Sequence, residues 1–217
     1  MIKLQGLSDD ELGLISRQIA NVFYDYPYPA ESRGLCAFLP EWDRMLTYID
    51  GIVRAGYRSG LLYTTSEKRE GYLMMTCSKG DSVRFLDGIR MILAMKKALG
   101  GWKELIRFIR AFLRNGGTFE LRMRKAKRDF IKVDLLAVRA EYQKQGFMKR
   151  MMEFAFELAA EQGVPVILET DDRDKCERYM HYGMKVDRSR EVAAGMQVYD
   201  LISTRSEERR VGKECRS

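Results

Sequence analysis

Residues Ile131 to Met152 read IKVDLLAVRAEYQKQGFMKRMM, and this stretch determines how the elements around it can be assembled. Its first part, Ile131–Val138, has the length and the apolar, β-branched character of a buried strand. A polar turn follows, and after Gly146 the pattern becomes helical. The first turn of a helix has backbone N–H groups without internal partners and attracts negative charge. Because Gly146 lacks a Cβ, a phosphate could approach closely, so the stretch predicts an anion site.

Helix and strand patterns alternate on both sides of this stretch. Ser8 and Glu11 form a capping-box pattern, and the helix that they start must end before the prolines of the Tyr24–Pro29 loop. Further helices are predicted over Pro40–Gly56, about Phe147–Gln162 and Asp172–Tyr182. Strands are predicted over Ile2–Leu4, Ser59–Thr65, Gly71–Cys77, Val164–Glu169, Met184–Val186 and Met196–Ile202. The order of elements after residue 131 predicts parallel pairing by right-handed crossover within an otherwise antiparallel sheet.

The segment 84–128 differs from its surroundings in charge. It holds thirteen Lys or Arg residues against Asp87, Glu104 and Glu120, a net charge of +10. Apolar residues form one stripe over 85–93 and a second over 102–113, with two glycines between them. We expect a helical hairpin, or a kinked helix, that packs on the body and leaves a basic face in solvent. Binding to an anionic membrane surface, a nucleic acid or an acidic substrate is the alternative.

The chain has 217 residues, of which 46% are apolar, and this suits one domain. No apolar run is long enough to span a membrane, and the N-terminus lacks a signal-peptide pattern. The cysteines have neither metal-site nor disulfide spacing, so we expect a cytoplasmic protein without a metal. The last thirteen residues, 205–217, resemble the translation of a common sequencing-library adapter rather than a native charged terminus. We therefore expect one domain over 1–204 and an artefactual tail.

Two blocks of the chain resemble the GCN5-related N-acetyltransferase (GNAT) superfamily. Residues 143–148, QKQGFM, resemble that family's acyl-coenzyme A loop, Gln/Arg-x-x-Gly-x-Gly/Ala. Residues 168–170, LET, and 179–184, YMHYGM, resemble its "LET … Y-E-x-x-G-F" block at the expected spacing. The resemblance covers most of residues 1–204. It implies an α/β (α+β) fold with a mixed, mostly antiparallel sheet flanked by helices, splayed parallel central strands and a helical insertion before the fourth strand.

The same resemblance implies transfer of an acetyl group from acetyl-CoA directly to a primary amine of a small molecule or peptide. The residues expected to hold the donor are Leu136, Ala137, Val138, Gln143, Lys144, Gln145, Gly146, Phe147, Met148 and Lys149. Tyr179 stands where the family places its general acid, although it could instead be a core tyrosine. Asp134, expected on the same strand face as Leu136 and Val138, and Glu169 are the candidate bases. Either could be a structural carboxylate, and a water-mediated route needs no dedicated base.

Three residues depart from the family pattern. Lys144 stands where glycine is common, Met148 replaces the final Gly/Ala, and Lys175 replaces a frequent asparagine. Met148 and Lys175 favour a second hypothesis, a regulatory or binding module of this fold that binds coenzyme A weakly or not at all and does not catalyse. A third hypothesis is binding to an anionic membrane or nucleic acid through the basic insertion. The sequence is compatible with a monomer or a homodimer.

Overall fold

The computed structural model describes residues 1–28, 34–193 and 196–203. The expected artefactual tail, 205–217, and Pro29 at the end of the first loop lie outside the described residues.

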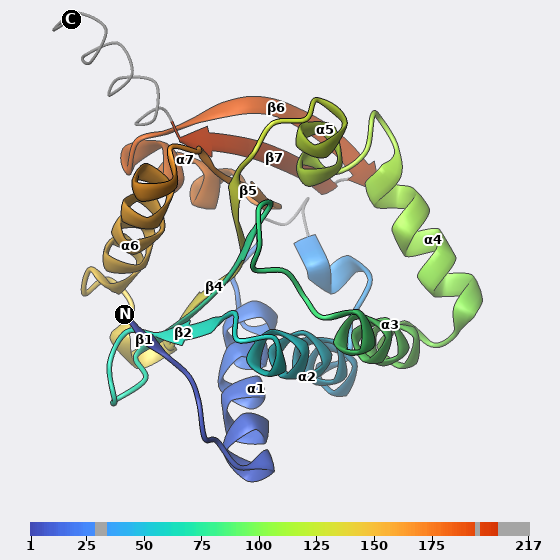
Figure 1. Ribbon diagram of the computed structural model, residues 1–217. Helices are drawn as coiled ribbons and strands as arrows, with labels where there is room; N and C mark the ends of the chain where they lie inside the picture. Colours follow the sequence, from blue (N-terminus) through green and yellow to red (C-terminus); the bar gives the residue numbers. More distant parts are fainter. Residues whose placement is uncertain (29–33, 194–195, 204–217) are drawn as a thin grey trace, which may run out of the picture.

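One mixed sheet runs through the described part of the chain, with its strands in the order β1-β2-β3-β4-β5-β7-β6 (Figure 1). The strands are β1 (Ile2–Lys3), β2 (Leu62–Thr64), β3 (Gly71–Cys77), β4 (Ile131–Val138), β5 (Val166–Thr170), β6 (Met184–Ala193) and β7 (Met196–Ser203). Every neighbouring pair is antiparallel except β4 and β5, which are parallel. The predicted mixed, mostly antiparallel sheet is therefore confirmed.

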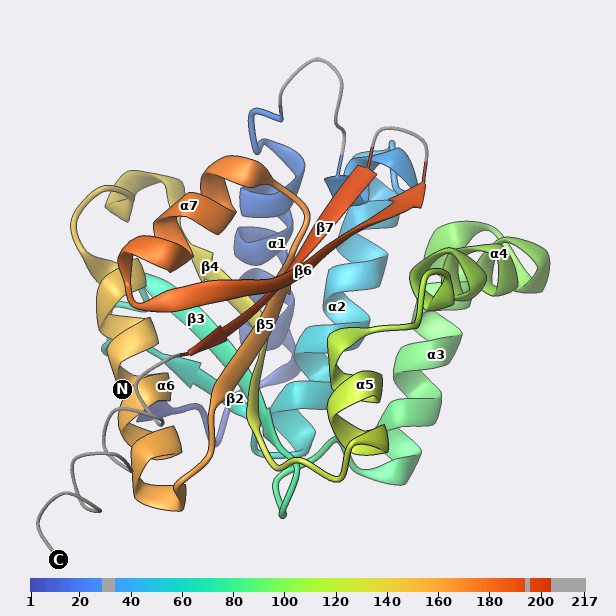
Figure 2. The same cartoon turned by 90° about the horizontal axis from the view of Figure 1, so that it is seen from above.

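Helices cover both faces of this sheet (Figure 2). The helices are α1 (Asp9–Tyr24), α2 (Trp42–Arg58), α3 (Phe85–Leu99), α4 (Trp102–Leu113), α5 (Phe119–Lys125), α6 (Phe147–Gln162) and α7 (Arg173–His181). α1 and α2 bury their apolar residues against one face, whereas α6 and α7 pack on the other. The capping box of Ser8 and Glu11 starts α1 as predicted. Within the described residues, no helix combines the length and the apolarity that crossing a membrane requires.

β4 and β5 separate soon after they begin. Only Ile131 and Lys132 pair with β5, opposite Val166 and Ile167. Farther along, the two strands diverge, so the backbone groups of residues 133–138 that face β5 are not used by it. The predicted splay of the parallel central strands is confirmed, and it leaves donors and acceptors that a ligand can satisfy.

A β-bulge in β4 changes which side chains point to which face. The register with β3 passes from Leu135 to Val133 and skips Asp134. Val133 packs in the apolar cluster beneath α6, whereas Leu135 packs in the cluster beneath α1 and α2. In a regular strand these two residues would share a face, so alternation alone does not predict the orientation of side chains around Asp134.

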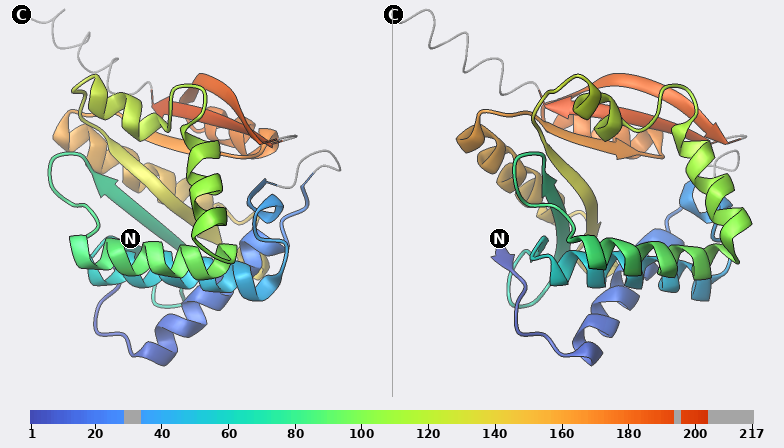
Figure 3. Two further views of the ribbon diagram at one scale, coloured as in Figure 1. Left: turned by 90° about the vertical axis from the view of Figure 1, so that its right-hand side faces the viewer. Right: turned by 45° about the vertical axis from the view of Figure 1, so that its right-hand side comes forward.

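The insertion between β3 and β4 forms the two predicted helices with the break at the glycines, but Figure 3 shows α4 at a steep angle to α3, so they are not an antiparallel hairpin. Gly100 ends α3 with a φ of 92°, a left-handed conformation that favours glycine. α3 packs on α2 at Gly51, where an added Cβ would lie only 2.5 Å from the Cβ of Ala94. The expectation that its stripe over 85–93 packs on the body is wrong. The stripe is exposed at Phe85, Ile89, Ile92 and Leu93.

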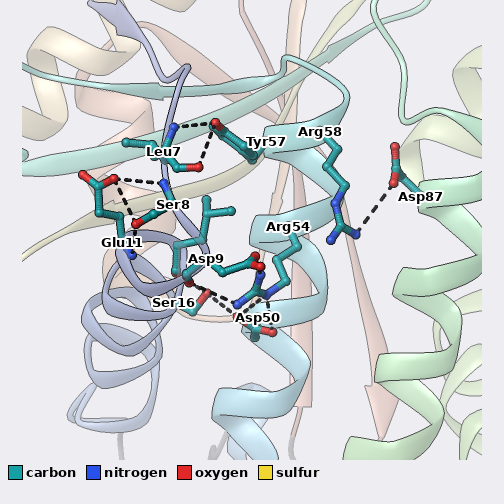
Figure 4. A network of polar contacts seen from close by, with 11 residues as sticks. Leu7, Ser8, Asp9, Glu11, Ser16, Asp50, Arg54, Tyr57, Arg58 and Asp87 are labelled. Carbon is teal, nitrogen blue, oxygen red and sulfur yellow. Dashed lines mark hydrogen bonds and ion pairs between the residues drawn. The ribbon is translucent and has the colours of Figure 1, made fainter.

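Polar contacts fix α2 to its neighbours on either side (Figure 4). Arg54 makes ion pairs with Asp9 of α1, at 2.6 Å, and with Asp50 of its own helix, at 2.9 Å. Arg58 lies 3.9 Å from Asp87, a buried carboxylate of α3. The first part of α3 is therefore held to α2 through its polar Asp87 and small Ala94, whereas Leu99 at its end packs in the core with α2.

Candidate active site

The loop between β4 and α6 is held in shape by its own side chains. The Gln143 amide donates to the Val138 carbonyl at 3.2 Å, and the Gln145 amide donates to the Glu141 carbonyl at 2.9 Å. Lys144 has a φ of 61°, a left-handed conformation that side chains other than glycine rarely adopt. This conformation gives a physical reason for the glycine that the family commonly has at this position.

The start of α6 is open. Gly146 occupies the N-cap position with a φ of 84°, and no side chain caps the helix there. A Cβ placed on Gly146 would have no atom within 4 Å, so the space beside the first turn is free. The exposed Lys144 and Lys149 lie on either side of Gly146 in the chain. Free N–H groups, free space and positive charge together suit a phosphate or pyrophosphate.

A cavity of about 240 Å³ continues along α6 toward the end of α7. The residues that line it are Lys149, Met152, Glu153, Phe156, His181 and Tyr182. His181 is exposed. The cavity is open to solvent and begins beside the first turn of α6, so an elongated ligand bound at that turn could extend into it.

Tyr179 is buried on α7, in the same apolar cluster as Leu136, Val138 and Met148. This cluster is where the structure brings the expected acid together with the expected donor strand and the start of α6. Burial raises the pKa of Tyr179, and the carboxylate of Asp171 raises it further. Its phenol therefore stays protonated at neutral pH. Among the described residues, the hydroxyl has no hydrogen-bond partner.

Asp134 is held in a chain of charges. Its carboxylate lies 2.9 Å from Lys132 Nζ and accepts a hydrogen bond of 2.7 Å from Thr76. Lys132 Nζ also lies 2.9 Å from Glu120. Burial acts to lower the pKa of Lys132, but the two carboxylates outweigh it and raise the pKa above its usual range.

The expected face of Asp134 needs correction. Asp134 pairs with Lys132, two residues earlier on β4, and both precede the point at which the bulge reverses the alternation. Leu136 and Val138 follow that point and pack beneath α6. The expectation that Asp134 shares their face is therefore wrong, because it assumed a regular strand. Ala137 also packs beneath α1 and α2, on the face opposite to Leu136 and Val138.

Glu169, the other candidate base, is also held by partners. It accepts a 2.8 Å hydrogen bond from the Phe119 N–H and forms an ion pair with Arg190. The neighbouring Leu168 packs with Tyr179, so Glu169 points to the opposite face of the sheet. Both candidate carboxylates thus lie away from the cluster of Tyr179, and both neutralise a cation.

Sequence reasoning missed a second cluster, in which the loop after α1 docks on the start of α7. The hydroxyls of Tyr26 and Tyr28 each donate a 2.7 Å hydrogen bond, to Asp172 and Asp171 respectively. Lys175 Nζ lies 3.1 Å from Asp171 and 3.8 Å from the centre of the Tyr26 ring. The two adjacent acids after a buried strand were the available signal. Their partners are more than 140 residues away in sequence, so no local pattern connects them.

A model of the acetyltransferase (GNAT) family matches residues 87–183, which include the loop at Gly146 and Tyr179. A comparison with curated protein sequences finds no match. Among solved structures, arylalkylamine N-acetyltransferase 7 of the yellow fever mosquito is similar, with a TM-score of 0.57 and 9% identity over 90% of this chain and 85% of that one. The C-terminal condensation domain of Ebony, in complex with β-alanyl-dopamine, is also similar. Its TM-score is 0.56 and its sequence identity is 8%, over 91% of this chain and 95% of that one.

A third structure, of an acetyltransferase, gives a TM-score of 0.50 and 13% identity over 92% of this chain and 97% of that one. At such identities the likeness to solved structures concerns the fold.

Proposed function

The chain belongs to the GNAT acetyltransferase superfamily, and from this premise we propose that it transfers an acetyl group from acetyl-CoA to a primary amine of a small molecule or peptide. The observation that carries the proposal is the divergence of β4 from β5 beside the uncapped start of α6. The unpaired backbone of β4 suits an amide-rich ligand arm, and the helix start suits a pyrophosphate. Coenzyme A has both groups, in that order.

Each expected donor residue has a role that its position supports. The backbone of Leu136–Val138 would bind the pantetheine arm, because this part of β4 has no pairing with β5. The N–H groups of Gly146, Phe147 and Met148 would bind the pyrophosphate, with Lys144 and Lys149 adding positive charge. Gln143 and Gln145 would act indirectly, since their amides hold the loop backbone.

The reaction requires two proton movements. A neutral amine attacks the thioester carbonyl, a C–N bond forms and the C–S bond breaks, so the nitrogen loses a proton and the sulfur gains one. Tyr179 is proposed as the acid, because its buried phenol keeps its proton at neutral pH and shares a cluster with Leu136 and Val138. The apolar surroundings also keep water from the thiolate.

For the base we favour the water-mediated route over Asp134 and Glu169. Taking a proton from the ammonium of the acceptor would neutralise the carboxylate that pairs with Lys132 or Arg190. Each of those cations would then lose one of its two carboxylate partners and keep only Glu120 or Asp200, at an energetic cost that a water relay avoids. Both carboxylates also face away from Tyr179, which makes them better suited to shaping the sheet.

The direct test is thermal unfolding of the chain ending at Thr204, with and without acetyl-CoA. A ligand that binds only the folded state at a hundred times its dissociation constant adds about 2.7 kcal/mol of stability, which is an increase in midpoint of about 5 to 10 °C for a chain of this size. No increase at millimolar acetyl-CoA would refute the proposal. If the midpoint rises, release of free thiol over a panel of amines tests transfer itself.

A second candidate is a module that binds coenzyme A without transferring its acetyl group. Lys175, which replaces a frequent family asparagine, favours it, because its ammonium is already committed to Asp171 and Tyr26. This candidate predicts the rise in midpoint without release of thiol from any amine. Thiol release above the rate of spontaneous hydrolysis would exclude it.

A further inference from the structure

The insertion exposes apolar side chains to an unusual degree. Of the thirteen large apolar residues that are exposed in the described part of the chain, nine lie on α3 and α4. These nine are Phe85, Leu86, Ile89, Ile92, Leu93, Trp102, Ile106, Ile109 and Leu113. Phe85 is 81% exposed and Trp102 is 53% exposed. Exposed apolar residues scattered singly are normal, but such a concentration marks an interaction surface.

α4 shows how the surface is built. Its packed row faces the body at Leu105, Phe108 and Ala111. A second row of side chains lies beside the packed row and is apolar and exposed. It consists of Trp102, Ile106, Ile109 and Leu113, at the helical spacing i, i+4, i+7 and i+11. A third row with the same spacing is basic and exposed at Lys103, Arg107, Arg110 and Arg114. An apolar strip therefore runs beside a cationic strip along the whole helix.

α3 continues the apolar strip. It is buried at Ala98, Leu99 and Asp87, whereas its large apolar side chains Phe85, Leu86, Ile89, Ile92 and Leu93 are exposed. Lys96 joins the two helices, because its Nζ lies 5.0 Å from the ring centre of Trp102. The exposed apolar residues of α3 and α4 thus meet at a cation that rests on an aromatic ring.

The cations of this surface are largely free of counter-charges. Among the described residues, Lys97, Lys103, Arg110 and Arg114 have no ion-pair partner, while Arg107 is paired with Glu104 at 3.4 Å. Residues 84–114, which include both helices, hold eight Lys or Arg residues against Asp87 and Glu104, a net charge of +6. Its positive charge is therefore available to an external anion.

We propose that α3 and α4 form a docking surface for an anionic lipid bilayer, and we name it the α3–α4 surface. A bilayer interface offers acyl chains to the apolar strip and anionic headgroups to the cationic strip, as amphipathic interfacial helices require. A nucleic acid would neutralise the cations but would leave Phe85, Leu86 and the apolar strip in water. A second copy of the chain would place two surfaces of net charge +6 against each other. The bilayer is the partner that satisfies both strips.

The test is co-sedimentation of the protein with vesicles of phosphatidylcholine and phosphatidylserine at 70:30, and with vesicles of phosphatidylcholine alone. We expect binding to the mixed vesicles, release when NaCl rises from about 0.1 to 0.5 M, and little binding to the neutral vesicles. Lys103→Gln with Arg110→Gln should weaken binding about tenfold or more, since each cation near an anionic surface contributes substantially. Arg17→Gln with Lys68→Gln, which removes the same charge from elsewhere on the exposed surface, should leave binding unchanged.

A matched pair of apolar substitutions tests the other strip. Leu86→Ser on α3 should weaken binding about fivefold, because a buried leucine side chain is lost from the bilayer. Leu14→Ser on α1, where the leucine is 52% exposed, should have no effect. Unchanged thermal midpoints will show that all variants are folded.

The proposal is overturned if mixed vesicles are not bound, or if neutral vesicles are bound equally well. It is also overturned if a 20-base-pair DNA displaces the vesicles and binds Leu86→Ser as tightly as the unmodified chain. None of these readouts depends on acetyl-CoA, so failure here leaves the proposed transfer reaction untouched.

Discussion

The ammonium of Lys175 lies 3.1 Å from the carboxylate of Asp171, one helical turn before it, and the pair is largely buried. Because the same ammonium rests on Tyr26, the pair fastens the loop after α1 to the start of α7. Lys175→Gln should therefore lower the free energy of unfolding by about 1 to 3 kcal/mol, since it leaves a buried carboxylate without its cation. Chemical denaturation of the unmodified chain and of Lys175→Gln measures this difference in the free energy of unfolding.

Arg173 and Glu177 provide the control for that measurement. They form an ion pair with the same four-residue spacing on the same helix, at 3.1 Å, but both side chains are well exposed. Arg173→Gln should cost less than about 0.5 kcal/mol. Equal losses from the two variants would show that the Lys175 contact contributes no more than a surface pair.

Removing the Tyr179 hydroxyl should separate catalysis from binding. Tyr179→Phe keeps the ring in its apolar cluster but deletes the proposed acid, so we expect kcat to fall about a hundredfold or more. The Kd for acetyl-CoA should change less than about threefold. Tyr63→Phe is the control, because burial also raises the pKa of Tyr63 but this residue lies on β2. A Tyr179→Phe enzyme with undiminished kcat would assign Tyr179 to packing alone.

Local chemistry in the sequence was enough to predict most elements, because caps, prolines, glycines and periodicity are local signals. The capping box at Ser8, the glycines between α3 and α4, and the turn at Gly146 all lie where the patterns place them. Contacts between distant segments were not predictable in the same way. The α1 loop docks on Asp171 and Asp172 through partners with no shared periodicity.

Two errors have a common origin in periodicity itself. The pattern over 85–93 correctly predicts a helix, but an apolar stripe does not say whether a body or an outside partner covers it. Alternation along β4 correctly predicts a strand, but the single extra residue of a bulge reverses every later side chain. α5 was not predicted at all, although Thr118 caps it by accepting from the Leu121 N–H.

Glycines at the two ends of α6 allow a controlled test of the donor site. Gly146 and Gly163 both have left-handed backbones, with φ of 84° and 65°, and both have free space where a Cβ would be. Gly146→Ala and Gly163→Ala should each cost about 1 kcal/mol of stability through backbone strain. Only Gly146→Ala should weaken acetyl-CoA binding, by about fivefold or more, because its methyl group enters the anion site. Calorimetry measures the affinity of each variant for acetyl-CoA. If Gly146→Ala and Gly163→Ala bind acetyl-CoA equally well, the pyrophosphate binds somewhere other than the start of α6.

Asp200 should make stability depend on pH. Burial first, and the neighbouring Glu169 carboxylate second, raise the pKa of this carboxyl from 3.8 to about 6 against the effect of Arg190 and Arg122. The folded state thus binds the proton more tightly than the unfolded state. Protonation of Asp200 therefore stabilises the folded state. This contribution to the free energy of unfolding is fully present below about pH 4 and is lost as the pH rises to about 6.

Asp200→Asn removes that proton equilibrium. The free energy of unfolding of the unmodified chain, minus that of Asp200→Asn, should therefore fall between pH 4 and pH 6 by on the order of 1 to 3 kcal/mol. Urea denaturation at several pH values gives this difference. A difference that rises with pH over this range would mean that the arginines, not burial, dominate the charge state of Asp200.

The identity of the base is decided by comparing Asp134→Asn with Glu169→Gln. Each substitution keeps the shape of the side chain but removes one of the two carboxylate charges that pair with Lys132 or Arg190. Both should therefore lower stability by about 1 to 3 kcal/mol. If water carries the proton, kcat/KM in each folded variant should fall less than about tenfold, and the acid limb of its pH profile should remain. If one variant instead loses more than about a hundredfold in kcat/KM and its pH profile no longer has the acid limb, the substituted carboxylate is the base. Only removal of the base changes both the rate and the acid limb.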